Sequence, residues 1–256
     1  MKNLIRYKDI IFYRILAGLK SEARKNYLGY YWFILEPLLS TGVLYFAMSH
    51  LTGQRGTGPI FEILLGMLAW QWFEGSVMQS AGSITQKYHV HIQVPLPKYL
   101  FPLVDVGTTT IRFACAFPLV VGAAFIFGNG PALALVWLPL VLALQLAFII
   151  GLSLVVSIGV TLMPDLRVLL QSIFRLLFFV SGIFFTAERV PAHLLPWYHA
   201  NPLTVFIESY RAIILKGTAP DFSLLASVLP MTVLIFIGGC LVQRHFDQRL
   251  LKLTNA

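Results

Sequence analysis

The chain has 256 residues, of which 57% are hydrophobic and only 12% are charged, far from the composition of a soluble domain. A net charge of +8 could suggest a nucleic-acid partner, but the basic residues gather where a membrane surface would meet them. Composition and charge therefore exclude a soluble domain, argue against nucleic-acid binding, and predict an all-α integral membrane protein.

The first 25 residues predict an amphipathic helix lying in the membrane interface. They mix apolar and charged positions and lack the continuous apolar core and cleavage site of a signal peptide. Their apolar positions recur at helical spacing: Leu4, Ile11, Phe12, Ile15, Leu16 and Leu19. Basic residues between them can reach lipid headgroups. We expect residues 1–30 to be a cytoplasmic interface helix, either a simple anchor or a brace for a cytoplasmic partner.

Six apolar stretches follow, each long enough to cross the ~30 Å hydrocarbon core, which requires ~20 residues of helix. They cover residues 31–51, 59–80, 100–127, 133–163, 168–185 and 222–242. Residues 31–256 are therefore predicted to form one domain of six transmembrane helices. Thirteen Lys and Arg residues fall on one side of these spans and four on the other. Positive residues stay cytoplasmic, so both termini are expected in the cytoplasm.

Two connections between the spans carry local structure. Residues 85–98 are polar and then broken by prolines, which predicts a short helix facing a cytoplasmic partner. Residues 190–216 contain two apolar pieces too short to span, separated by Asn201-Pro202, which ends one helix and can start the next. This pattern predicts two short re-entrant helices between the fifth and sixth spans, entering from the external side and lining or capping a cavity. Glu208 and Arg211, three residues apart, could pair on one helix face or form a solvated surface pair.

No catalytic or metal-binding constellation is present in the sequence. The chain lacks the G-x-x-x-x-G-K-[ST] loop that binds nucleotide phosphates. His89 and His91 diverge on a helix and have no third ligand nearby, so we expect no metal site. Cys115 and Cys240 lie in separate spans and are expected to be packing residues. The sequence predicts a transport subunit and not an enzyme, with no bound cofactor and its energy supplied by another chain.

Polar and aromatic residues inside the spans are the candidates for substrate contact. An intramembrane charge costs ~2.5–3.5 kcal/mol, so each needs a wet or protein-lined position, as a helix-orienting pair or as part of a path. Trp70 and Trp72 lie deeper than the aromatic belt at the membrane surface explains. Aromatic faces stack on sugar rings, so an aromatic-lined channel would suit a sugar polymer.

With these motifs in place, the chain resembles the membrane subunits of ABC-2 type exporters that carry polysaccharides to the bacterial surface. The resemblance covers nearly the whole length. It rests on Leu28-Gly29, Trp32 and Glu36-Pro37 before and within the first span. Trp70-Gln71-Trp72-Phe73 resembles the second span of O-antigen exporters, and the run 94–102 resembles the exit from their coupling helix. Asn201-Pro202-Leu203, followed by Glu208 and Arg211, is similar in O-antigen and capsule exporters. Pro164-Asp165 and the run 179–185 are closer to capsule exporters of the KpsM type. The turn Met163-Pro164-Asp165 departs from the Phe-Arg-Asp common in O-antigen exporters, so the polymer stays open.

The resemblance implies a homodimer in the bacterial inner membrane, paired with two ATPase subunits that bind ATP and magnesium. The substrate would be a lipid-linked capsular or O-antigen polysaccharide, and periplasmic or outer-membrane export proteins would be further partners. Residues 85–98 would be the coupling helix, and residues 190–216 the external gate. The coupling residues are Tyr88, Val90, Ile92 and Lys98. The residues lining the channel or contacting substrate are Tyr31, Trp32, Glu36, Trp70, Trp72, Arg175 and Phe184. The gate residues are Asn201, Pro202, Glu208 and Arg211.

Other functions fit the sequence less well. An ABC-2 exporter of teichoic acid, lipid or drug shares the same architecture. An ATP-independent channel or carrier would favour an internal repeat of spans, and the two halves of the chain do not align. A membrane-embedded glycosyltransferase would need clustered acids near a donor-sugar pocket, whereas Asp165, Glu188 and Asp221 are isolated.

Overall fold

The computed structural model describes residues 2–25, 27–52, 57–86, 97–127 and 133–254, which form helices and connections with no β-strand among them. The long helices are α1 (Lys2–Lys25), α2 (Trp32–Thr52), α3 (Thr57–Ala81), α6 (Leu100–Phe127), α7 (Leu138–Leu162), α8 (Leu166–Val180) and α11 (Phe222–Thr254). The short elements are η1 (Gly29–Tyr31), α4 (Ser83–Gln86), η2 (Leu133–Trp137), η3 (Ala187–Arg189), α9 (Leu195–Ala200), α10 (Pro202–Arg211) and η4 (Ala212–Lys216). The predicted all-α architecture is confirmed for these residues.

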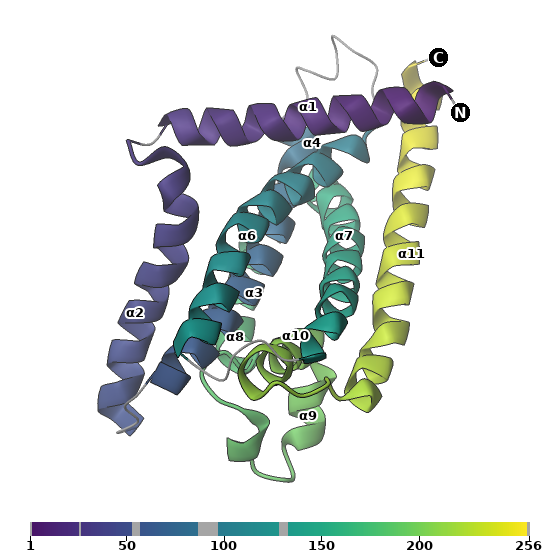
Figure 1. Cartoon of the computed structure of the whole chain (residues 1–256). Coiled ribbons are helices and arrows are strands. Elements are labelled where there is room, and N and C mark those ends of the chain that lie inside the picture. Colours follow the sequence, from purple (N-terminus) through teal and green to yellow (C-terminus); the bar gives the residue numbers. More distant parts are fainter. Residues whose placement is uncertain (1, 26, 53–56, 87–96, 128–132, 255–256) are drawn as a thin grey trace.

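The long helices form a bundle that α1 crosses at one end (Figure 1). Helices α9 and α10 lie at the opposite end of the bundle. The N-terminal end of α1 and the C-terminal end of α11 both lie at the end of the bundle that α1 crosses.

Helix α1 is held on the bundle by its apolar face. Ile15 and Leu19 are buried in a small cluster with Val104 of α6. Gly107 on α6 makes room for Ile15, because a Cβ there would collide with the end of the Ile15 side chain. Phe12 and Leu16, which belong to the same apolar pattern, stay exposed in the subunit. The N-terminal helix thus has two apolar surfaces, one of which packs on α6.

Among the described residues, four helices are long and apolar enough to cross a membrane: Gly29–His50, Leu100–Ile126, Leu133–Leu162 and Phe222–Phe246. They correspond to the first, third, fourth and sixth predicted spans. The second predicted span falls on α3, which is long enough to cross a membrane. Its polar residues, which include Glu62 and Glu74, lower its mean hydropathy, and it is not one of these four helices. The fifth falls on α8, which has only 15 residues and ends at Val180, five residues before the predicted end. Gly182 follows with a positive φ of 70°, a left-handed conformation that ends the helix early.

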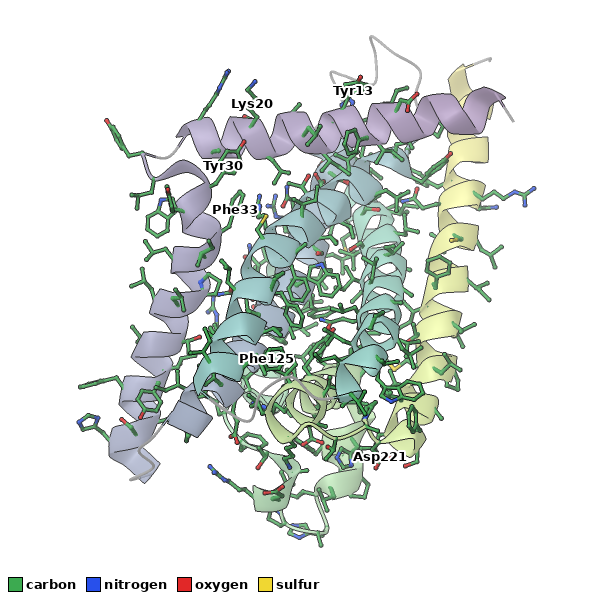
Figure 2. All side chains as sticks on the ribbon, viewed as in Figure 1. Tyr13, Lys20, Tyr30, Phe33, Phe125 and Asp221 are labelled. Carbon is green, nitrogen blue, oxygen red and sulfur yellow. The ribbon has the colours of Figure 1, made fainter. Side chains whose placement is uncertain are left out.

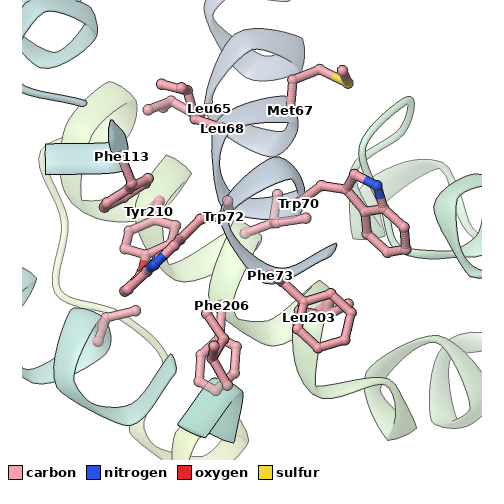
Figure 3. Close-up of a cluster of buried hydrophobic side chains, with 14 of the residues drawn as sticks. Leu65, Met67, Leu68, Trp70, Trp72, Phe73, Phe113, Leu203, Phe206 and Tyr210 are labelled. Carbon is pink, nitrogen blue, oxygen red and sulfur yellow. The ribbon is translucent and has the colours of Figure 1, made fainter. Parts of the chain in front are cut away.

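The core of the subunit is built around α3. Trp70 has 2% of its surface exposed and its ring lies against Phe174 of α8, with centroids 6.3 Å apart. On another side of α3, Trp72 stacks on Phe113 of α6 at 4.3 Å. Phe206 of α10 is also fully buried here (Figure 3). Helix association in lipid depends on such close packing and on buried hydrogen bonds more than on the hydrophobic effect.

Helices α7 and α11 pack closely through two glycines. A Cβ at Gly239 would lie 2.6 Å from the carbonyl oxygen of Gly151, and a Cβ at Gly151 would lie 2.7 Å from the backbone of Phe236. One turn further along α11, the Gln243 amide donates to the Ser157 hydroxyl at 3.0 Å. Small residues at a helix crossing followed by a polar cross-link are typical of membrane helix pairs.

Candidate functional site

The end of the bundle opposite α1 is organised by Asn201. This residue separates α9 from α10, so the break predicted at Asn201-Pro202 is present. Its side-chain oxygen accepts from the Leu203 N–H at 3.1 Å and caps α10, and Pro202 occupies the first helical position, where its missing N–H has no cost. The Asn201 amide also donates to the Ser181 hydroxyl at 3.0 Å, which ties the start of α10 to the end of α8.

Arg211, at the other end of α10, joins three segments of the chain. Its guanidinium has five N–H donors, and five contacts to backbone carbonyls are present. Two N–H groups donate to the Glu62 carbonyl of α3, at 3.2 and 3.0 Å. The others reach the segment after α8, through the carbonyls of Gly182 at 2.8 Å, Ile183 at 2.9 Å and Phe185 at 3.3 Å. Only 3% of Arg211 is exposed, so these contacts are what make a buried guanidinium tolerable.

Glu208 binds a different set of partners on the same helix. Its Oε1 accepts from the Ala187 N–H at 2.8 Å and from the Tyr198 hydroxyl at 3.1 Å. Its Oε2 lies 3.4 Å from Nε2 of His199, a contact that becomes an ion pair when the imidazole is protonated. Glu208 therefore connects α10 to α9 and to the segment before it.

The direct Glu208–Arg211 pair considered from their spacing is not formed. Each side chain binds partners from other elements: carbonyl oxygens surround Arg211, and hydrogen-bond donors surround Glu208. Tyr210, which lies between Glu208 and Arg211 on α10, makes a further buried link. The Tyr210 hydroxyl donates to Oε1 of Gln145 on α7 at 2.6 Å, and the Gln145 amide donates to the Ala69 carbonyl of α3 at 3.0 Å.

A cavity of about 310 Å³ opens beside α10 and carries charges of both signs. Its acidic side chains are Glu62, Glu188, Glu208 and Asp221, and its basic or titratable ones are His199, Arg211 and Lys216. At its exposed edge, the Lys216 ammonium lies 2.7 Å from Glu188 and lowers the pKa of that carboxyl. Asp221 accepts from the hydroxyl and the N–H of Ser223, and these hydrogen bonds lower the pKa of Asp221. The end of the bundle opposite α1 thus carries polar side chains that largely pair with one another.

The predicted channel-lining residues occupy different environments in the subunit. Tyr31 is 74% exposed, and Glu36 and Arg175 are also exposed, whereas Trp32 and Phe184 are half-buried. Trp70 and Trp72 are buried inside the subunit, Trp70 donating to Glu74 at 2.6 Å and Trp72 to Thr110 at 3.1 Å. Their rings are packed against neighbouring phenylalanines, so any part in a channel stays a prediction.

The predicted coupling helix falls mostly outside the described residues. Tyr88, Val90 and Ile92 lie in the segment 87–96, and α4 ends just before it at Gln86. Lys98 is described, with its ammonium 5.3 Å from the centroid of the Phe246 ring on α11. Its coupling role also stays a prediction.

Sequence reasoning missed three residues that contribute to the hydrogen bonds of Glu208 and Arg211. Tyr198 binds Glu208, Gly182 makes the turn that presents its carbonyl to Arg211, and Glu62 contributes its backbone oxygen. A glycine after an apolar run was the only local signal for the turn, and a backbone acceptor leaves no signal in the sequence. A Cβ at Gly182 would also collide with the Tyr198 hydroxyl, so this position needs glycine for its conformation and for space.

The arrangement is a bundle of apolar helices with a polar, hydrogen-bonded end opposite α1. The ABC-2 type transporter family model matches residues 15–215. The chain belongs to the ABC-2 type transporter family. The match extends from the apolar face of α1 to η4, and so includes α10 with both Glu208 and Arg211.

Curated relatives of this ABC-2 transporter are similar over most of their length. An O-antigen export system permease protein RfbA of Klebsiella pneumoniae is 27% identical over 217 residues, covering 84% of each chain. A protein of the same name from Myxococcus xanthus is 24% identical over 238 residues, covering 92% of this chain and 91% of the relative. Together with the apolar helices, these matches establish a multi-pass membrane transport subunit of the ABC-2 type.

Proposed function

We propose that this chain is the channel-forming subunit of an ATP-driven exporter that moves a lipid-linked O-antigen polysaccharide across the bacterial inner membrane. The observation that carries the proposal is the similarity, over 84% and 92% of this chain, to permeases named for O-antigen export. Both termini would face the cytoplasm, on the side crossed by α1, because the basic residues gather there.

The exposure of α2 and α8 supports a homodimer of six-span subunits. Only 11% of the residues in the apolar stretch of α2 are buried in the subunit, against 22–33% in the other three candidate spans. Helix α8 exposes Arg175 among apolar residues such as Leu176 and Phe179. An arginine facing lipid would be costly, whereas the same side chain facing a wet channel between two copies would not. In this proposal α3 and α8 complete the six spans, and α2 and α8 line the channel.

The remaining parts of the exporter follow from the same architecture. Helices α9 and α10 would form the external gate, with Asn201 and Pro202 at its turn and Glu208 and Arg211 holding it to the bundle. The segment 85–98 would be the coupling helix, through which two separate ATPase subunits transmit the energy of ATP hydrolysis. ATP and magnesium would bind those subunits, since this sequence has no phosphate-binding loop.

Deletion of the gene from its host tests the proposal. We expect O-antigen to disappear from the cell surface while lipid-linked polymer accumulates inside, and a plasmid copy of the gene to restore export. Immunoblots of the cell surface should show unchanged capsule. Unaltered surface O-antigen in the deletion strain would contradict the proposal.

Capsular polysaccharide is the second candidate substrate. It is favoured by the resemblance at Pro164-Asp165, which forms the turn into α8, and along residues 179–185. Selective loss of capsule in the same deletion strain would identify this substrate. Export of teichoic acid, lipid or drug would leave both surface polymers in place.

A further inference from the structure

A second cavity, of about 330 Å³, opens between α2, α3 and α6. It is on the side of the bundle that α1 crosses, and Figure 2 shows Phe33 between α2 and α6, just below α1. Each of the three helices contributes one charged side chain to the lining: Glu36 from α2, Glu74 from α3 and Arg112 from α6. The volume is that of a small-molecule site, and its position is separate from the external gate.

The walls of this cavity are held in place. Trp72 stacks on Phe113 and donates to Thr110, which makes a rigid aromatic wall between α3 and α6. The Trp70 N–H binds Oε2 of Glu74 at 2.6 Å and orients that carboxylate, which has further lone pairs to offer. The Arg112 guanidinium carbon lies 5.4 Å from the centroid of the Phe33 ring, so a cation–π contact positions the arginine across the cavity.

Charges of both signs around one aromatic cavity suit a zwitterionic ligand. A guanidinium recognises phosphate through paired N–H donors, and a carboxylate accepts hydrogen bonds from a primary ammonium. Two carboxylates match the three N–H donors of an ammonium better than they match a quaternary amine, which has none. We propose that this cavity binds an aminoethyl phosphate group, with Arg112 on the phosphate and Glu36 and Glu74 on the ammonium.

The membrane itself is the source of such a group. Phe33 is the second residue of α2, and Glu36 lies one turn further, about 6 Å from the start of the helix. The cavity therefore lies at the depth of the headgroups on the α1 side, where phosphatidylethanolamine presents both a phosphate and a primary ammonium. A lipid bound there would fill the space between α2, the span least buried in the subunit, and the rest of the bundle. This inference does not depend on the exported cargo.

Native mass spectrometry of the purified full-length chain in detergent tests the proposal. The protein is titrated separately with phosphatidylethanolamine, phosphatidylcholine and phosphatidylglycerol of identical acyl chains. We expect selective retention of phosphatidylethanolamine, and an affinity about tenfold or more weaker in Arg112→Gln and in Glu36→Gln, since each loses a charge-assisted hydrogen bond. Arg244→Gln and Glu188→Gln remove the same charges from exposed positions outside the cavity and should bind as the wild type does.

Two additions keep the result interpretable. Arg112→Lys keeps the positive charge and should retain most of the binding. If Arg112→Gln does not fold, Glu36→Gln tests the proposal in its place, because Glu36 is exposed. Competition by soluble glycerophosphoethanolamine at the concentration of the lipid would overturn the lipid source, whereas absence of competition supports it. Equal binding of the three lipids, or unchanged phosphatidylethanolamine binding in folded Arg112→Gln and Glu36→Gln, would overturn the proposal.

Discussion

Arg211 is the residue on which the end of the bundle opposite α1 depends. Replacement by alanine leaves buried carbonyls of α3 and of the segment after α8 without donors, each at a cost of ~1–3 kcal/mol. We expect Arg211→Ala to lower the free energy of unfolding in detergent by about 3 kcal/mol or more. Arg211→Lys should recover only part of this, because an ammonium cannot reproduce the planar fork of donors.

Chemical or thermal unfolding of the purified chain measures the Arg211 effect. Arg244→Ala provides the control, since Arg244 is exposed on α11 and its loss should change stability by no more than ~0.5 kcal/mol. Equal stability of the two alanine variants would show that the carbonyl contacts do not hold the structure together.

Glu188 provides a pH-dependent test at the same end of the molecule. Lys216 lowers the pKa of this carboxyl from its ordinary value of 4.5. A lowered folded-state pKa means that the contribution of the pair is present above pH 4.5 and is lost as the pH falls through the folded-state value. We expect Lys216→Ala to raise the pKa of Glu188 back toward 4.5, measured by NMR titration of the labelled carboxyl. An unchanged pKa would mean that the ion pair is absent in solution.

At the scale of elements, the α7–α11 crossing offers a matched pair of glycines. A methyl group at Gly239 would meet the backbone of Gly151 at 2.6 Å, whereas one at neighbouring Gly238 would meet nothing within 4 Å. We expect Gly239→Ala to reduce stability by about 1–3 kcal/mol through overpacking, and Gly238→Ala to be neutral or slightly stabilising. Unfolding of both variants under the same conditions measures the difference. Equal stabilities would contradict the close crossing.

Helix α10 is held by the hydrogen bonds of Glu208, Tyr210 and Arg211, so the proposed gate should fail when one of these connections is removed. Glu208→Ala deprives Tyr198 and the Ala187 N–H of their acceptor and loosens α9 from α10. We expect higher ion conductance through reconstituted dimers, while Glu208→Gln, which keeps an acceptor oxygen, leaks less. Glu188→Gln is the control, because it removes a carboxylate that binds only at the exposed edge. Conductance equal to that of the wild type in folded, dimeric Glu208→Ala would exclude this gate.

At the scale of the whole molecule, the proposed division of labour predicts the energetics of transport. The purified chain alone should show no ATP hydrolysis, because its sequence has no phosphate-binding loop. Adding the partner ATPase subunit that the proposal requires should form a stable complex that hydrolyses ATP. A phosphate-release assay on the chain, the ATPase and the complex compares the three. Hydrolysis by the chain alone at the rate of the complex would contradict the proposal.

The sequence by itself determined the features that depend on local chemistry. An apolar run of sufficient length must form its hydrogen bonds within a helix when it enters lipid, so four of the predicted spans are present with nearly the same bounds. Asn201 and Pro202 cap and start a helix through their own side chains, so the break between α9 and α10 was predictable as well. Periodicity likewise predicted the apolar face of α1, of which Ile15 and Leu19 pack on α6 while Phe12 and Leu16 stay exposed.

The tertiary structure decided which partner each polar residue meets. Glu208 and Arg211 are close in sequence, but Arg211 donates to a carbonyl 149 residues away, and no local pattern records such a contact. Trp70 and Trp72 are buried, and not part of an exposed aromatic surface, because α6 and α8 pack over them. The early end of α8 has the same origin. Gly182 turns the chain there, and the Gly182 carbonyl accepts a hydrogen bond from Arg211. Local composition specifies helices, whereas packing between distant segments specifies which side chains are buried, paired or left facing a cavity.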